Sequence, residues 1–413
     1  NRRYARNWGR LGMKSDWQVK KLSDIVEFNP TERLPKGAIA KKIPMDILQP
    51  FTKDIFQYEL QPYNGGAKFR NGDTIMARIT PCLENGKVSK VNILTKDEVG
   101  FGSTEYIVLR AIPNVSDPDF IYYLTISDFV RAPAIKSMVG SSGRQRVQQN
   151  VLETLKLPLP PYDEQKKIAA ILSALDEKIA INREINDNLE QQTASLYFSM
   201  FVSYDYYANM EFEDSEFGRI PKGWQVLSLD DVTINIRDRV HNNNYRVLSA
   251  LNSGILQPSD EYFTKQVFSK DISNYIIVAE NDFAYNPARV NIGSLGINDL
   301  GYTGCVSPVY VVFRTENNYQ NFMRFFVKSK RFQEEVKTRA SGSVRQAMNY
   351  ADFSLIRLVY PPKSAIDEFN DMVEPIWKNI KHLRQENEKL SELRDSLLPK
   401  LMSGEIDVSA VQL

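Results

Sequence analysis

Residues suited to metal binding or nucleophilic catalysis are scarce in this chain. Its 413 residues include two cysteines, Cys82 and Cys305, and two histidines, His241 and His382. A zinc site or a histidine-based catalytic centre needs several such side chains at short spacings, so neither is expected. We expect the two cysteines, which lie far apart in the sequence, to be buried free thiols in a reducing cytoplasm.

Long apolar runs and nucleotide-binding loops are also missing. No run of 18 apolar residues occurs, which argues against a membrane-spanning helix. Residues 1–13 are basic without an apolar core, so we interpret them as a leader before a native start at Met13 rather than as a signal peptide. There is no Walker loop, and the glycines at Gly100 and Gly102 lack the third glycine and the strand–loop–helix order of a nucleotide-binding motif.

What the chain does contain is an internal repeat. The stretch LPPYDEQKKIAAIL from Leu159 has a degenerate counterpart from Tyr360, and a shift of 201 positions places Arg144 on Arg345. Shorter stretches recur in the same order: Trp17-Gln18-Val19 and Trp224-Gln225-Val226, Gly72-Asp73-Thr74 and Asn281-Asp282-Phe283, and Tyr106 to Arg110 and Val309 to Arg314. A period of about 200 residues is too long for a solenoid, so it predicts two globular domains and two matching helices.

The repeat divides the chain into consecutive segments. Both globular segments mix short β-rich runs with stretches of helical spacing. The expected fold class is therefore α+β, with two mixed α/β domains separated by two long antiparallel coiled-coil helices and related by pseudo-two-fold symmetry. The predicted segments are a first domain at 14–161, a first helix at 162–201, a linker at 202–222, a second domain at 223–362, a second helix at 363–404 and a tail at 405–413.

Both helices carry a heptad seam, in which apolar residues recur in alternating steps of three and four. The seam residues are Leu172, Leu175, Ile179, Asn182, Asn186 and Leu189 in the first helix, and Val373, Ile376, Ile380, Leu383, Asn387 and Leu390 in the second. We expect antiparallel packing, because the intervening domain lets the chain run out along one helix and back along the other. The seam asparagines either fix the register or mark a loosened, solvated midpoint.

The net charge of +1 conceals a segregation of charge. Residues 1–161 contain 24 Lys and Arg against 16 Asp and Glu, and residues 223–362 contain 15 against 13. Residues 162–222 and 363–413 are acidic, with 6 basic against 12 acidic and 7 against 10. Positive charge on the globular segments is expected of a phosphate-binding surface, whereas acidic helices indicate a protein partner.

Two matching loops, at residues 141–149 and 339–346, are rich in arginine and glutamine and are the main candidates for DNA contacts. Solvated connections at the surface would also explain them. Arg and Gln read guanine and adenine edges bidentately, and Arg also binds phosphates. We hypothesise that the shared Arg144 and Arg345 contact phosphates or position their loops, and that unshared polar residues, such as Arg78 and Thr80 against Arg289 and Asn291, read base edges. The candidate DNA-binding residues are Lys68, Arg70, Arg78, Thr80, Arg144, Gln145, Arg146, Gln148, Arg289, Asn291, Arg339, Arg345 and Gln346.

From residue 17 to residue 406 the chain resembles the specificity subunit of Type I restriction–modification systems. The resemblance is strongest at 159–179, at 217–224 and at 397–406; in the second helix Ser364-Ala365-Ile366 stands where the first has Asp163-Glu164-Gln165. It implies a non-catalytic cytoplasmic protein whose two domains each read one half of a split site in double-stranded DNA. The helices would hold two methylation subunits and set the half-site spacing, and endonuclease/translocase subunits would join the full complex. S-adenosylmethionine, ATP and Mg²⁺ are then expected on those partners, with no cofactor or metal on this chain.

Two interpretations from other classes stay open on the sequence alone. One is a stand-alone DNA-modifying or DNA-cleaving enzyme with an unfamiliar site. The other is a coiled-coil scaffold without any nucleic-acid function. Activity of the isolated chain would favour the first, and failure to bind DNA beside a methylation partner would favour the second.

Overall fold

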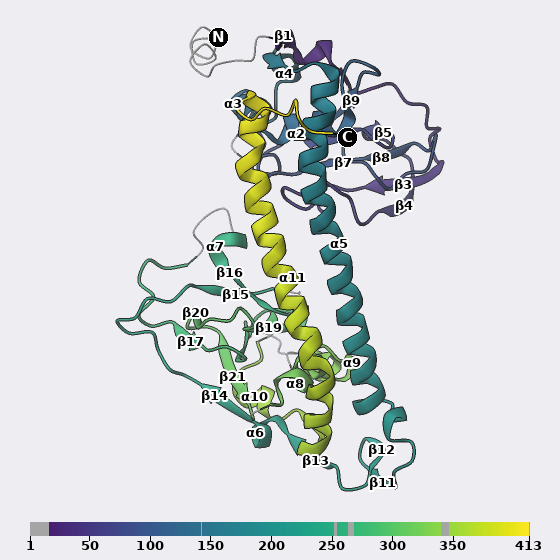
Figure 1. Cartoon of the computed structure of the whole chain (residues 1–413). Helices are drawn as coiled ribbons and strands as arrows, with labels where there is room; N and C mark the ends of the chain where they lie inside the picture. Colours follow the sequence, from purple (N-terminus) through teal and green to yellow (C-terminus); the bar gives the residue numbers. More distant parts are fainter. Residues whose placement is uncertain are drawn as a thin grey trace. The chain divides into compact units, whose positions relative to one another are not determined.

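The computed structural model describes residues 16–141, 143–251, 254–262, 268–316, 318–339 and 347–412 (Figure 1). Its contacts define two compact units: unit 1 comprises 1–184 and 383–413, and unit 2 comprises 185–382. Two long helices, α5 (Tyr162–Phe201) and α11 (Lys363–Ser403), contribute one end to each unit. The predicted segment boundaries stay predictions, because this division cuts through both helices.

Unit 1 is built on an antiparallel four-stranded sheet in the order β2–β9–β6–β7, with a second sheet in the order β4–β3–β8–β5. The strands of the first sheet are β2 (Val26–Phe28), β6 (Thr74–Ala77), β7 (Val88–Lys90) and β9 (Tyr106–Ala111). Those of the second are β3 (Ile39–Ile43), β4 (Glu59–Pro62), β5 (Lys68–Phe69) and β8 (Gly100–Gly102). The remaining elements are β1 (Gln18–Lys21), β10 (Lys156–Leu159), α2 (Pro118–Ile126), α3 (Asp128–Lys136) and α4 (Gln149–Glu153).

Unit 2 repeats the main sheet of unit 1 in the order β14–β21–β18–β19. Its strands are β14 (Thr233–Ile236), β18 (Phe283–Tyr285), β19 (Leu295–Ile297) and β21 (Val311–Thr315). A two-stranded pair also recurs, with β1 beside β10 in unit 1 and β13 (Gln225–Ser228) beside β22 (Arg357–Tyr360) in unit 2. The helices include α6 (Leu229–Val232), α8 (Gln320–Phe326), α9 (Lys330–Arg339) and α10 (Tyr350–Ser354).

The order of strand pairing therefore follows the sequence repeat. In unit 1, β1 is in register with β10 so that Gln18 faces Leu159, and in unit 2 Gln225 faces Tyr360. In both units this pair lies directly before a long helix, which explains why the apolar stretch before each helix is so similar. The expected α+β class with two mixed domains and two long helices is confirmed, while the pseudo-two-fold symmetry stays a prediction.

The seam of α5 and α11 is buried or half-buried at every predicted position. Within unit 1 the two helices run antiparallel, because Asn182 bonds to Asn387 while Asp176, which precedes Asn182, bonds to Arg394, which follows Asn387. Asn182 is 0% exposed and Asn186 is 7% exposed, so neither asparagine lies at a solvated midpoint. For these two residues that alternative is wrong, while Asn387 is half-buried and the role in register stays a prediction.

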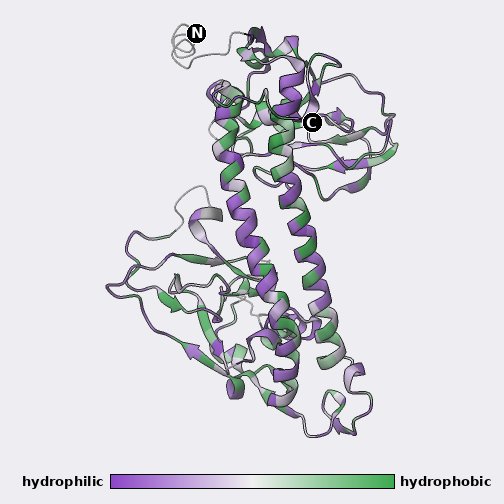
Figure 2. Ribbon diagram, viewed as in Figure 1, coloured by the Kyte–Doolittle hydropathy of each residue, from purple (hydrophilic) through white to green (hydrophobic). Residues whose placement is uncertain are grey.

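Both long helices carry hydrophobic and hydrophilic residues along their whole length (Figure 2). A helix with one buried face requires hydrophobic residues at every third or fourth position. α11 ends where Gly404 takes a left-handed conformation with φ of +76°, which is the common backbone solution at a helix C-terminus. None of the described helices combines the length and the apolarity that crossing a bilayer requires. Both cysteines are free, as expected, but only Cys305 is fully buried and Cys82 is half-buried.

Candidate nucleic-acid interface

One aspartate–arginine pair recurs in both units and fixes their residue equivalences. Arg110 donates from Nε and Nη2 to the two carboxylate oxygens of Asp73, both at 2.7 Å. Arg314 donates to Asp282 in the same way, at 2.6 and 2.9 Å. Each aspartate also accepts a backbone N–H from three residues earlier in the chain, at 2.7 Å in unit 1 and 2.9 Å in unit 2. The echo between 72–74 and 281–283 in the sequence is therefore a structural equivalence.

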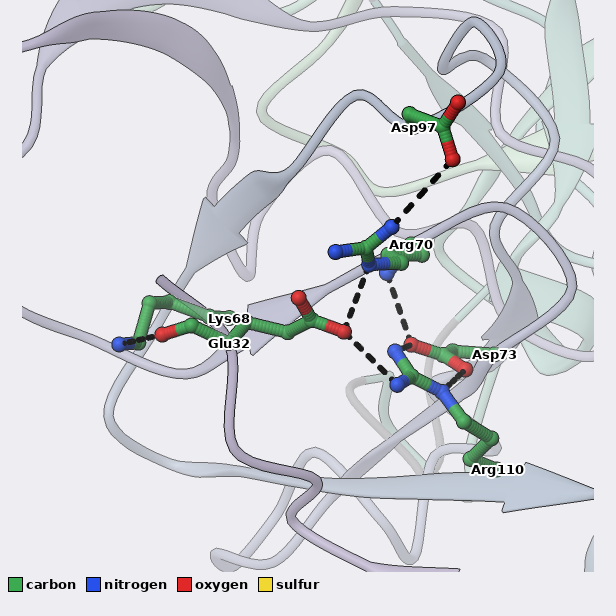
Figure 3. Close-up of polar contacts among 6 residues, drawn as sticks. All are labelled: Glu32, Lys68, Arg70, Asp73, Asp97 and Arg110. Atoms are coloured by element: carbon green, nitrogen blue, oxygen red, sulfur yellow. Dashed lines mark hydrogen bonds and ion pairs between the residues drawn. The ribbon is translucent and has the colours of Figure 1, made fainter. Parts of the chain in front are cut away.

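Lys68 and Arg70 both bond to Glu32, which lies beside this pair in unit 1 (Figure 3). Arg70 Nε and Arg110 Nη1 both donate to Glu32 Oε1 at 2.7 Å, and Lys68 Nζ donates to the Glu32 carbonyl oxygen. The hydrogen bond from Arg70 lowers the pKa of the Glu32 carboxyl, against the effect of its burial. Both cations thus have internal partners, and their roles on DNA stay predictions.

Four other predicted residues meet where the segment after β6 lies beside residues 145–147. The Thr80 N–H donates to the Gln145 carbonyl at 3.0 Å, and Val147 N–H donates to the Arg78 carbonyl at 2.8 Å. Arg146 forms β-bridges with both Ile79 and Val139. The structure thereby brings Arg78, Thr80, Gln145 and Arg146 onto one part of unit 1, although 65 residues separate Thr80 from Gln145.

Glu105 lies beside two of these residues, Arg78 and Arg146, and was not among the predicted ones. Arg146 donates to its carboxylate from Nε at 2.9 and 3.0 Å and from Nη2 at 2.6 Å. Arg78 Nε lies 3.9 Å from the same carboxylate. The hydrogen bond from Arg146 lowers the pKa of Glu105, and burial opposes this shift. We call Arg78, Glu105 and Arg146 the Glu105 cluster.

The two remaining predicted residues of this loop differ in their surroundings. Arg144 is exposed, and its side chain makes no hydrogen bond or ion pair with the described residues. Gln148 is half-buried; its N–H donates to Ser137 Oγ at 3.2 Å and its Nε2 donates to the Arg146 carbonyl at 3.4 Å. Arg144 is thus available to a ligand, whereas Gln148 supports the loop.

In unit 2 the predicted residues are less concentrated. Arg289 is exposed directly before the short 3-10 helix Val290–Ile292, which contains the half-buried Asn291. Arg339 ends α9, where its Nε donates to Glu335 at 3.0 Å and its Nη2 donates to the Leu355 carbonyl at 3.5 Å. Arg345 and Gln346 lie outside the described residues. No predicted role in this unit is tested by these positions.

Across the described ranges, no three His, Cys, Asp or Glu side chains lie close enough together to hold a metal ion.

Comparisons with known proteins agree with the architecture. The model of the Type I restriction modification DNA specificity domain matches residues 14–191. The Type I restriction enzyme MjaIX specificity subunit of Methanocaldococcus jannaschii is 24% identical, and the alignment covers 95% of this chain and 94% of the relative. The HindI specificity subunit of Haemophilus influenzae is 22% identical over 95% of this chain and 100% of its own length.

A solved structure shows the same fold. The S subunit of a Type I restriction–modification system from M. genitalium superposes with a TM-score of 0.53 at 14% identity, over 94% of this chain and 96% of that one. The sequence relatives span nearly the whole chain, so the similarity includes both domains and both long helices. Over nearly its whole length the chain is similar in sequence to specificity subunits of Type I restriction–modification systems, and it shares the fold of one of them.

Proposed function

We propose that this chain recognises DNA for a Type I restriction–modification complex, and that each α/β domain reads one half of a bipartite site in double-stranded DNA. The observation that carries the proposal is the convergence of Arg78, Thr80, Gln145 and Arg146 on one part of unit 1. Side chains of these types hydrogen-bond to base edges and phosphates. Unit 2 repeats the same sheet with different polar residues around it, which suits a second, different half-site.

We propose that the chain itself is not catalytic and that the chemistry belongs to its partners. Two methylation subunits would supply the S-adenosylmethionine, and the endonuclease/translocase subunits would supply the ATP and Mg²⁺ chemistry. The helical segments suit docking of such subunits, because residues 162–222 and 363–413 are acidic and because α5 exposes Ile181 at 52% and Phe198 at 56%. Free thiols support a cytoplasmic location for the assembly.

We propose further that α5 and α11 set the distance between the half-sites. They are continuous over 40 and 41 residues, and both carry the heptad seam. One heptad inserted into each helix adds about 10 Å, which corresponds to roughly three base pairs of B-DNA. We expect the non-specific spacer of the methylated motif to lengthen accordingly. An unchanged motif in the methylome of cells carrying the insertion would refute this spacing role.

The central experiment measures sequence-specific DNA binding by the full chain assembled with its methylation subunits. Methylome sequencing of the source cell gives the recognised motif, and duplexes with and without that motif are then compared at several salt concentrations. We expect the motif duplex to bind at least a thousandfold more tightly than the other, as specific binders typically do. Equal binding of both duplexes would contradict the proposal and favour a scaffold.

A second measurement tests the stand-alone enzyme. The isolated chain is incubated with the motif duplex and either S-adenosylmethionine or Mg²⁺. We expect neither methyl transfer nor cleavage until the partner subunits are added. Turnover by the isolated chain would show that it carries catalytic residues of its own.

A further inference from the structure

At the equivalent described positions of unit 2, the Glu105 cluster has no charged counterpart. In unit 1 the last residue of β6, Ala77, pairs with Tyr106, and in unit 2 the last residue of β18, Tyr285, pairs with Val311. Tyr285 corresponds to the residue directly before Ala77. These two registers define which residues of the units are equivalent. The hydrogen bond from Val147 to the Arg78 carbonyl likewise matches the one from Met348 to the Pro287 carbonyl, at 3.1 Å. The residues equivalent to Arg78, Glu105 and Arg146 are Pro287, Val309 and Ala347.

This difference contrasts with the shared aspartate–arginine pair, which lies at the opposite end of β6 and β9. Residues that both units share serve the fold or the phosphate backbone, which every half-site has. A charged cluster that only one unit carries is available for a task that only one half-site demands. Val309 is 63% exposed, so the equivalent position in unit 2 is also at the surface but offers no hydrogen-bonding side chain.

The geometry of Arg146 leaves one particular edge of its guanidinium available. Glu105 accepts from Nε and Nη2, which occupies the side edge of the group. The end edge, formed by Nη1 and Nη2, keeps two parallel N–H groups, and such a pair matches the O6 and N7 acceptors of guanine in the major groove. The Arg146 side chain is 43% exposed, so this edge is accessible to a ligand.

The Arg78 side chain lies near Glu105 but makes no hydrogen bond to its carboxylate. Its Nε is buried and has no hydrogen-bond partner among the described residues, and 3.9 Å to Glu105 is too long for a hydrogen bond. A buried donor that is left unsatisfied calls for an explanation. The Glu105 carboxylate lies within 3.9 Å of both guanidinium groups and offsets the repulsion between them.

We propose that Glu105 is a positioning residue that presents the end edge of Arg146, with Arg78 beside it, to a guanine in the half-site read by the first domain. This inference rests on the proposed function and adds the base and the residue that selects it. Holding Arg146 in place before DNA arrives reduces the conformational entropy lost on binding. The second domain, with Pro287, Val309 and Ala347 at these positions, reads no guanine there.

Replacing Glu105 by glutamine has two opposite effects on DNA binding. Loss of a negative charge close to the phosphates strengthens binding to every sequence. Loss of the anchored guanidinium weakens discrimination at one guanine of the first half-site by about tenfold, within the range known for one bidentate contact. A Glu105 that only stabilised the fold would not raise affinity for other sequences while relaxing a single base.

The experiment uses the full chain assembled with its methylation subunits and a panel of duplexes that carry each single-base change of the recognised motif. The variants are E105Q, R146K and the double variant. R146K keeps the charge for phosphates but loses the planar fork. The control is E98Q, because Glu98 lies in the same unit, pairs with Lys41 at 3.1 Å and loses the same charge.

We expect E105Q and R146K to relax the same guanine, the double variant to be no worse than either, and E98Q to relax none. Discrimination at the second half-site should be unchanged, which also shows that the variants are folded. Relaxation at different bases, relaxation in both half-sites, or no relaxation at all would overturn the inference. If E105Q does not assemble with the methylation subunits, R146K alone tests the inference. Equally weakened binding of R146K to every duplex would then overturn the inference. A wild-type complex that does not distinguish the duplexes would instead overturn the proposed function.

Discussion

Arg394 on α11 and Asp176 on α5 are joined by a hydrogen bond of 2.7 Å between Nη1 and Oδ1, although 218 residues separate them in the sequence. Both side chains are buried, with 8% and 7% exposed. The hydroxyl of Tyr123 on α2 donates to the other oxygen of Asp176 at 2.6 Å. One carboxylate therefore joins both long helices to the core of unit 1. In unit 2, a contact between the rings of Phe325 and Trp377 links α8 to α11.

The variant R394M should destabilise unit 1 by about 3 kcal/mol, because it leaves the buried Asp176 carboxylate without its cation. Urea denaturation followed by a probe in unit 1 measures the loss. K389M is the matched control, since Lys389 is exposed on the same helix and should change the stability by less than about 0.5 kcal/mol. Equal effects of the two variants would show that the buried pair is not a structural joint.

The variant N182L should raise the stability of unit 1 by about 1 kcal/mol, because buried polar groups are often less stabilising than well-packed apolar ones. Asn182 is fully buried, and its Oδ1 has no hydrogen-bond partner among the described residues. Asn387 keeps its bond to the Ile179 carbonyl at 3.4 Å. The thermal midpoint measures the gain, and N188L at an exposed position of α5 is the control.

The cost of N182L should appear in register rather than stability. If the asparagine fixes how α5 and α11 align, complexes that contain the variant should methylate motifs of more than one spacer length. Methylome sequencing of cells that carry N182L resolves this. A single unchanged spacer together with increased stability would mean that the asparagine has no role in register.

Breaking the shared framework pair should cost more in unit 1 than in unit 2. R110M leaves two buried carboxylates, Glu32 and Asp73, without this cation, and should cost about 3–5 kcal/mol. R314M affects Asp282 alone, and the Arg314 side chain is 48% exposed, so solvent already weakens that pair. Hydrogen exchange of the β6 and β18 amides compares the two losses, and a larger loss in unit 2 would contradict the comparison.

Glu32 should make unit 1 sensitive to acid. Its pKa in the folded chain is lowered below the usual value of 4.5, chiefly by the hydrogen bond from Arg70. A depressed pKa contributes stability that is complete above the usual value and is lost as the pH falls through the lowered one. E32Q should therefore be less stable than the wild type at pH 7 but lose less stability on acidification. Parallel stability curves for the two proteins below about pH 5 would contradict this role.

Arg144 and Arg78 should have different effects on DNA. R144A removes an exposed cation, so it should weaken binding to all sequences and reduce the salt slope by about one unit. R78A should cost about 1–3 kcal/mol and relax one position of the motif. Binding of both variants, assembled with the methylation subunits, is measured against salt and against single-base variants. If R144A relaxes one base and R78A weakens all sequences equally, the two roles are reversed.

The sequence by itself determined the features that repeat or are periodic. The heptad spacing predicted which side chains of α5 and α11 are buried, because a helix brings residues three and four apart onto one face. The echo between 72–74 and 281–283 predicted an equivalence that the two aspartate–arginine pairs confirm. These signals are local or are repeated in full, so they can be read without knowing how the chain folds back on itself.

The tertiary structure decided which charges meet. The sequence predicted that Lys68 and Arg70 contact DNA, yet both bond to Glu32, which is 36 residues from Lys68. Glu105 carries no local signal, since a lone carboxylate before a strand is ordinary, and its partner Arg146 is 41 residues away. Ion pairs form between side chains that sheet pairing and loop closure bring together. Their partners are therefore set by nonlocal packing, which neither composition nor spacing encodes directly.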